Sequence, residues 1–130
     1  MRSRIWLVLW IAGILFPIEF LARVWPAFGK IFNPFFSPDW VHIVMHTLLY
    51  SGLVFLLAQA ISPISAKAVL VLMGMGVLVG CLQESVQLLI ARAWPGWPAE
   101  ILDLSVDLMG ASIGISLSWI WMRFKRTANS

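Results

Sequence analysis

The sequence predicts an all-α protein, an integral membrane bundle of four transmembrane helices that forms a single domain over residues 1–130. Of its 130 residues, 61% are hydrophobic and only 12% are charged, and the mean hydropathy is +0.91. Soluble domains contain roughly 45–50% apolar residues, so much of this chain should lie in lipid. Its apolar runs are each about 20 residues long, which matches the thickness of a bilayer.

The four predicted helices cover residues 5–22, 41–61, 68–91 and 101–122. The first run could be a signal peptide or a retained helix. We take it as a retained helix, because it continues through Pro17 and has only a weak cleavage site. The second run stops before Ser62 and Pro63, where the proline breaks the helix. The third run is uncharged until Glu84, and the fourth carries Asp103 near its start.

Two connections between the predicted helices are rich in aromatic residues and proline. Residues 23–40 contain two tryptophans and four phenylalanines, which indicates a segment lying in the membrane interface. Residues 93–100, with the sequence AWPGWPAE, pair two Trp-Pro units around Gly96. This pattern predicts a tight hairpin that is anchored at the level of the lipid headgroups.

The distribution of charge predicts how the bundle is oriented. Four crossings place both termini on one side, and that side would hold six of the nine Lys and Arg residues. By the positive-inside rule it is the cytoplasmic side, so both termini should be cytoplasmic. All six acidic residues fall in the outer half or beyond it. The basic residues form no continuous patch, so we expect no nucleic-acid partner.

Ionisable side chains on three of the predicted helices fall at one depth in the membrane. At 1.5 Å per residue, Glu84 lies about 10 Å, Asp107 about 9 Å and His46 about 8 Å below the outer boundary. A charged group facing lipid costs roughly 2.5–3.5 kcal/mol, so these groups should face one another or a wet cavity.

Helical spacing predicts which side chains share a face. Separations of 4, 3 and 4 residues align Gly80, Glu84, Gln87 and Ala91 on the third helix, and Asp103, Asp107, Gly110 and Gly114 on the fourth. His42, His46 and Tyr50 form the matching stripe on the second helix.

Together these stripes predict a polar pocket that opens to the outside. Its ligand-binding residues would be His46, Tyr50, Glu84, Gln87, Arg92, Asp103 and Asp107, and Gly80, Gly110 and Gly114 would allow close packing of the third and fourth helices. The alternative is that the polar groups only hold the helices together through hydrogen bonds, each worth about 0.6–2 kcal/mol.

A spaced set of these residues resembles the VanZ-like family of small bacterial membrane proteins. The set comprises E84-x-x-Q87, Arg92, D103-x-x-x-D107-x-x-G110-x-x-x-G114 and, on an earlier span, H46-x-x-x-Y50. The resemblance covers about residues 39–114. The family typically has an Asp four residues before the His, where this chain has His42, and an Asn at the position of Asp107. Its gap between the Arg and the first Asp is shorter than the one here.

The resemblance implies a small bacterial membrane protein with the cell envelope as its setting, so we expect the four predicted spans to cross the bacterial cytoplasmic membrane. The family is named for a member associated with teicoplanin resistance, a property that the resemblance does not transfer to this chain. The partners implied are a membrane lipid and a lipid-linked or glycopeptide-type envelope ligand.

Three functions fit these residues. We favour a membrane protein, not demonstrably enzymatic, whose outward-facing pocket binds a lipid headgroup or an envelope component without a cofactor or metal. The main rival is an intramembrane hydrolase or metalloenzyme, because His42 and His46 have the spacing of helical metal ligands and Glu84 and Asp107 could complete a site. The HExxH signature is absent, however. Ion or proton translocation is the third possibility, motivated by intramembrane acids.

The predicted topology can be tested with reporter fusions. Because basic residues gather on one side, fusions at Ser130 and near Lys67 should report the cytoplasm, and fusions near Lys30 and Gly96 should report the outside. A periplasmic signal from Ser130 would overturn the predicted orientation.

Overall fold

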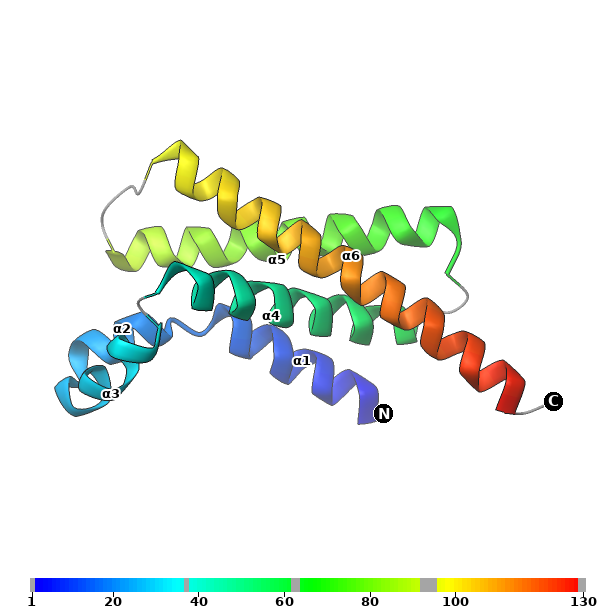
Figure 1. Ribbon diagram of the computed structural model, residues 1–130, viewed down its shortest axis with the longest axis horizontal. Coiled ribbons are helices and arrows are strands. Elements are labelled where there is room, and N and C mark those ends of the chain that lie inside the picture. Colours follow the sequence, from blue (N-terminus) through cyan, green and yellow to red (C-terminus); the bar gives the residue numbers. More distant parts are fainter. Residues whose placement is uncertain (1, 37, 62–63, 92–95, 129–130) are drawn as a thin grey trace.

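The computed structural model describes residues 2–36, 38–61, 64–91 and 96–128, and every regular element within these ranges is an α-helix. In chain order the helices are α1 (Arg2–Leu15), α2 (Ile18–Val24), α3 (Pro26–Phe36), α4 (Asp39–Ala60), α5 (Ala66–Ala91) and α6 (Trp97–Ala128) (Figure 1). The predicted all-α class is thus confirmed for the described ranges. Ser62, Pro63, Arg92 and the first part of the predicted 93–100 hairpin lie outside them.

Among the residues that the structure describes, three helices are long and apolar enough to cross a membrane, namely α4, α5 and α6. With 22, 26 and 32 residues they measure about 33, 39 and 48 Å, against about 30 Å for the hydrocarbon core of a bilayer. Large apolar side chains cover the outer surface, and Leu70 and Leu89 are 74% and 78% exposed. Such a surface suits lipid rather than water, so the chain is a multi-pass membrane protein.

The first apolar run forms two helices instead of the single helix predicted over residues 5–22. α1 ends at Leu15 and α2 begins at Ile18. Pro17 lies between them, and it has no backbone N–H to continue the helical hydrogen bonds. Its ring also disfavours the helical conformation at Phe16. With 14 residues α1 measures about 21 Å, which makes it shorter than the three long spans.

The aromatic segment predicted over residues 23–40 contains the end of α2 and all of α3. Its rings stack in sequence along one side, because they follow one another at helical spacings of three or four residues. The stacked pairs are Trp25–Phe28, Phe28–Phe32 and Phe32–Phe36, with ring centroids 6.0, 5.4 and 4.3 Å apart. α2 and α3 pack against each other and lie at one end of the bundle (Figure 1).

The boundaries of α4 and α5 lie within two residues of the predicted 41–61 and 68–91, whereas α6 extends past the predicted 101–122 at both ends. At its start, Gly96 has a φ of 99°, a conformation that favours glycine. Pro98 follows in the first turn, where its missing N–H leaves no helical hydrogen bond unmade. At its end, Lys125 and Arg126 interact favourably with the helix dipole.

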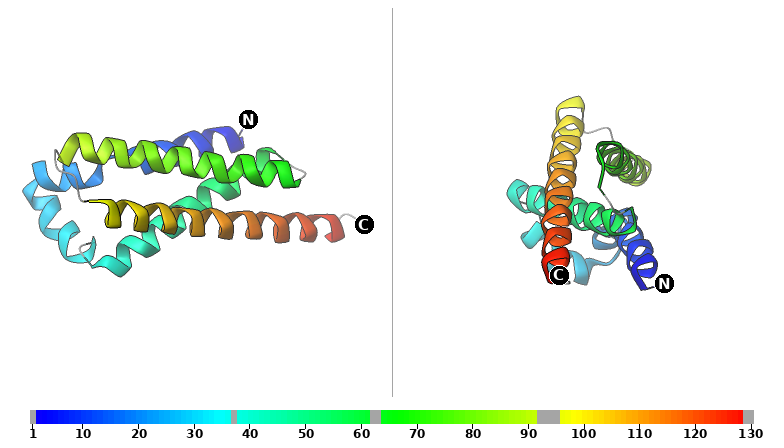
Figure 2. Two further views of the ribbon diagram at one scale, coloured as in Figure 1. Left: turned by 90° about the horizontal axis from the view of Figure 1, so that it is seen from above. Right: turned by 90° about the vertical axis from the view of Figure 1, so that its right-hand side faces the viewer.

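The helices are arranged around α4, which contacts α1, α3, α5 and α6. The two termini lie at the same end of the bundle (Figure 1), and Figure 2 shows the same arrangement from two further directions. The opposite end holds α2, α3, the first residues of α4 and α6, and the last residues of α5.

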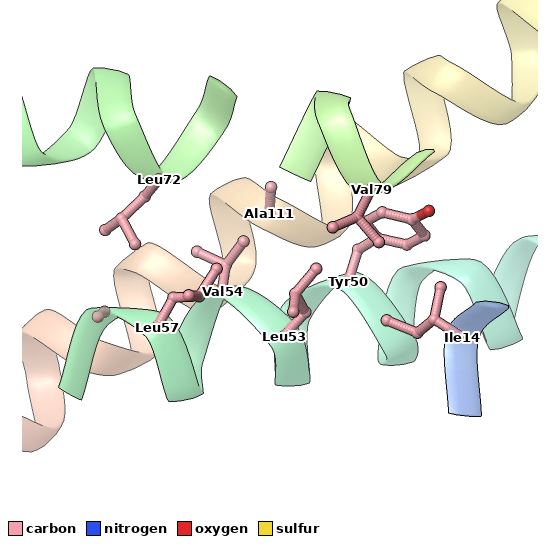
Figure 3. Close-up of a cluster of buried hydrophobic side chains, with 9 residues drawn as sticks. Ile14, Tyr50, Leu53, Val54, Leu57, Leu72, Val79 and Ala111 are labelled. Carbon is pink, nitrogen blue, oxygen red and sulfur yellow. The ribbon is translucent and has the colours of Figure 1, made fainter. Parts of the chain in front are cut away.

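The hydrophobic core follows one side of α4 and includes one tyrosine. Its labelled members in Figure 3 are Ile14 of α1, Tyr50, Leu53, Val54 and Leu57 of α4, Leu72 and Val79 of α5, and Ala111 of α6. Tyr50 is 0% exposed and yet carries a hydroxyl group. A buried hydroxyl is costly unless it is hydrogen-bonded, so a polar partner is required inside the bundle.

Two glycines let α6 pack closely against α4. A Cβ at Gly110 would lie 2.7 Å from the carbonyl oxygen of Thr47, and one at Gly114 would lie 2.5 Å from that of Ser51. The spacing of these glycines had predicted a close approach between the third and fourth helices. In the structure they face α4, the second long apolar run, because α4 and α6 run parallel with a nearly constant offset of 61 to 63 residues.

This packing predicts a sharp contrast between two glycine substitutions. Gly114→Ala should lower the free energy of unfolding by about 1–3 kcal/mol, because the new methyl group meets backbone atoms of α4 that cannot move aside. Gly74→Ala on α5 is the control, since a Cβ there has nothing within 4 Å. It should leave stability unchanged or raise it by up to about 1 kcal/mol. Thermal unfolding in detergent measures both, and equal effects would contradict the assigned contact.

Candidate functional site

Two Asp–His pairs join α4 to α6 at the end of the bundle opposite the termini. His42 Nε2 lies 3.0 Å from Asp103 Oδ1, and His46 Nδ1 lies 2.8 Å from Asp107 Oδ1. Each helix contributes two residues four positions apart, so the second pair repeats the first pair one turn further along the two parallel helices. The rings of His42 and His46 also contact each other, with centroids 4.2 Å apart and the ring planes tilted by 36°.

The two pairs differ in their access to the surroundings. The side chains of His46 and Asp107 are only 5% and 3% exposed, whereas those of His42 and Asp103 are 38% and 18% exposed. The inner pair is therefore almost fully buried, and the outer pair is partly exposed.

The inner pair extends through two more side chains into a buried polar network. The Tyr50 hydroxyl donates to Gln83 Oε1 at 2.9 Å, and Gln83 Nε2 lies 3.4 Å from His46 Nε2. Since the amide oxygen accepts from Tyr50, the amide N–H group faces the imidazole, whose Nε2 must then accept. The proton of a neutral His46 consequently sits on Nδ1, from which it donates to Asp107. This assignment satisfies every member of the network.

Gly80 provides the space that this network needs. A Cβ at position 80 would lie 2.8 Å from Asp107 Oδ2 and 3.5 Å from the Tyr50 hydroxyl oxygen. Gly80 therefore faces polar side chains, while Gly110 and Gly114 face the backbone of α4. A larger residue at position 80 would push the carboxylate away from His46.

A cavity of about 430 Å³ lies beside this network. Its volume falls within the range of roughly 300–1,000 Å³ that is typical of small-molecule sites. The end of α1, the helices α2 and α3, the first turns of α4, the end of α5 and Glu100 of α6 all line it. The polar residues of the lining are Arg23, His42, His46, Gln83, Glu84, Gln87 and Glu100. The remainder is apolar and includes several phenylalanines.

The predicted pocket residues occupy two layers. His46, Glu84 and Gln87 line the cavity. Tyr50 and Asp107 are buried behind it in the polar network. Asp103 is hydrogen-bonded to His42, which lines the cavity. Arg92 lies outside the described residues.

Sequence reasoning missed Gln83, which links Tyr50 to His46. The stripe of Gly80, Glu84 and Gln87 passes beside it. The same 4, 3 and 4 spacing also joins Gly76, Gly80, Gln83 and Gln87, and two members of this second stripe, Gly80 and Gln83, contact the network. A pair of glycines followed by a pair of glutamines was the available signal. Arg23 and Glu100 also line the cavity but were not among the predicted site residues.

The two histidines are arranged to bind carboxylates rather than one shared metal. Each directs a ring nitrogen at a different aspartate. Within the described ranges, no group of three or more His, Cys, Asp and Glu side chains is placed to hold a metal ion.

Comparisons with protein-family models, with curated proteins and with solved structures found no match to this chain. The resemblance to the VanZ-like family therefore stays a prediction that rests on the spaced polar residues.

The buried network predicts that Gln83 and Tyr50 are energetically coupled. Gln83→Leu should lower the free energy of unfolding by about 1–3 kcal/mol, because it removes the Gln83 partner of both the Tyr50 hydroxyl and His46 Nε2. Tyr50→Phe should then cost less in the Gln83→Leu background than in the wild type, since the Tyr50 hydroxyl has already lost its bond to Gln83 there.

Unfolding measurements on the two single variants and the double variant test this coupling. Ser105→Ala is the control, because the exposed Ser105 hydroxyl bonds only to the Ile101 carbonyl of its own helix. Strictly additive effects of the Gln83 and Tyr50 substitutions would contradict the network.

Proposed function

We propose that this chain is a VanZ-like protein of the bacterial cytoplasmic membrane that binds the polar head of a membrane lipid or lipid-linked envelope component. The observation that carries the proposal is the cavity, which combines carboxylate, imidazole and amide groups with apolar walls at one end of a membrane bundle. A ligand with one polar and one apolar part fits such a lining. Family membership is supported by the spaced residues from His46 to Gly114.

In this proposal α1, continued by α2, makes the fourth crossing. The Trp10 indole N–H donates to the carbonyl oxygen of Leu49 at 2.8 Å, and its ring lies so close to Gly52 that a Cβ there would be 2.5 Å away. These contacts fix α1 against α4. A crossing at this position agrees with the two termini lying at the same end of the bundle.

The proposed orientation puts the cavity on the outer side of the membrane. Lys67 at the start of α5, and Arg123, Lys125 and Arg126 at the end of α6, belong to the end of the bundle that holds the termini. The cavity belongs to the opposite end, which holds the start of α4 and the end of α5. The positive-inside rule supports a cytoplasmic location for the basic end.

Hydrolysis fits the arrangement less well than binding does. A general base must present an accepting nitrogen to the reacting group. His46 is well oriented by Asp107, but its Nε2 faces the amide of Gln83. Ser85 follows Glu84 on α5 and carries a hydroxyl group, but it is exposed and donates to the carbonyl oxygen of Cys81 within its own helix.

Blocking the cavity tests whether an amphiphile binds there. Leu88 lines the cavity, and its neighbour Leu89 is 78% exposed on the outer surface. Leu88→Trp should fill part of the cavity and abolish the binding of a tightly held lipid, whereas Leu89→Trp should leave that binding intact. Native mass spectrometry of protein purified in mild detergent measures the lipid retained per chain. Equal retention by both variants, or no retained lipid in the wild type, would contradict the proposal.

A further inference from the structure

We infer that the cavity selects a lipid whose head carries a primary amine together with a phosphate. This inference rests on the proposed function, because it names the class of headgroup that the same cavity would bind. It follows from the charged side chains that line the cavity and from a buried carboxylate oxygen among them that has no hydrogen-bond donor within the described residues.

Two carboxylates form the amine-binding part of the cavity. Glu84 at the end of α5 and Glu100 at the start of α6 both belong to the lining. The Oε1 atom of Glu100 is buried and has no hydrogen-bond partner among the described residues. A buried acceptor without a donor is unfavourable, so a ligand that brings N–H groups would stabilise this end of the cavity.

The aspartates of the Asp–His pairs add to the negative field at this position. The carboxylates of Asp103, Glu100 and Asp107 act on Glu84 as like charges, and His46 acts on it with the opposite sign. Asp103 and Asp107 are each bonded to a histidine, whereas Glu84 makes no hydrogen bond or ion pair with another described residue. A cation is therefore better suited than an anion to the space beside Glu84 and Glu100.

Arg23 supplies the complementary charge. It lies in the last turn of α2, is exposed, and is the only Lys or Arg among the described residues that line the cavity. Within those residues it forms no ion pair. A guanidinium group binds phosphate through paired N–H donors. A lining that combines one arginine with two glutamates matches a head that carries a phosphate and an amine.

The apolar walls fit the beginning of an acyl chain. Phe16, Phe20 and Phe36 line the cavity on one side, and Val86 and Leu88 of α5 line it on another. Phe16, Phe20 and Phe36 are also 54%, 45% and 40% exposed, so they continue from the cavity to the outer surface of the bundle. The head and the first part of a chain can occupy the cavity while the rest of the lipid stays in the bilayer.

Defined lipids test the selectivity directly. Delipidated protein is titrated with phosphatidylethanolamine, phosphatidylglycerol or phosphatidylcholine of identical acyl chains, and binding is followed by native mass spectrometry. Phosphatidylethanolamine should bind at least about tenfold more tightly than the other two. Phosphatidylglycerol brings no cation, and the choline head of phosphatidylcholine has no N–H to donate to the glutamates.

Three variants separate the two parts of the headgroup site. Glu100→Gln and Glu84→Gln should each weaken the binding of phosphatidylethanolamine and leave that of phosphatidylcholine nearly unchanged. Using both guards against a folding defect in one, and thermal unfolding checks that each variant is folded. Arg23→Gln should weaken all three lipids alike, because all three carry the phosphate. Asp39→Asn is the matched control, since Asp39 is an exposed acid at the start of α4 outside the cavity lining.

The outcomes distinguish the inference from the function on which it rests. Equal affinity for the three lipids, with binding abolished by Leu88→Trp, would overturn the headgroup selectivity and leave the lipid-binding function standing. Binding that is insensitive to Leu88→Trp would overturn both. A preference for phosphatidylglycerol would overturn the selectivity, because it would show that Arg23 outweighs the two glutamates.

Discussion

The close parallel packing of α6 on α4 positions the rest of the candidate site. Gly110 and Gly114 bring the α6 backbone into contact with the carbonyl groups of Thr47 and Ser51. One turn nearer the end of the bundle, the same register aligns the acids of α6 with the histidines of α4, and Asp107 is held against His46. Without glycines at the contact, larger side chains would separate the two helices and no Asp–His pair could form at hydrogen-bond distance. Helix packing and site geometry therefore share one cause.

The buried network allows polar side chains to lie inside an apolar bundle, because they form hydrogen bonds with one another. The network consists of Asp107, His46, Gln83 and Tyr50, and all four are buried in the bundle. An unpaired polar group at such a position would cost several kcal/mol, about as much as one exposed to the hydrocarbon of a bilayer. Each of them has a partner, and the sequence of donors and acceptors runs in one direction from Tyr50 to Asp107. Reversal of the Gln83 amide would place its oxygen against the unprotonated Nε2 of a neutral His46, so that two acceptors would face each other. The network thus specifies one arrangement of α4, α5 and α6.

The helices and their polar faces could largely be predicted from the sequence, because both depend on patterns that repeat along a helix. The apolar runs predicted α4 and α5 within two residues, and the stripe containing His46 and Tyr50 correctly faces the acids of α6. The partner of the glycines was not accessible, since spacing identifies a helix face without saying which helix it meets. The break at Pro17 was underestimated, because hydrophobicity continues through it. Gln83 was missed because two overlapping stripes satisfy the same period, and only the packed neighbours decide between them.

The acids at this end of the bundle divide into two groups: those bonded to histidines join helices, and those without hydrogen-bond partners among the described residues are available to bind a ligand. Asp103 and Asp107 each hold a histidine, so their charges are committed to joining α4 and α6. Glu84 and Glu100 line the cavity, and the structure gives them no hydrogen-bond donor within the described residues. In a membrane protein an acid without an internal partner is expensive to keep, so a ligand or ordered water must complete its hydrogen bonds. The cavity lies directly against these unpaired acids, whereas the paired acids form the wall behind it. A ligand bound there would consequently meet a wall whose polar groups already have hydrogen-bond partners. It would also meet two carboxylates that can still accept hydrogen bonds, and these can select a headgroup by its N–H donors.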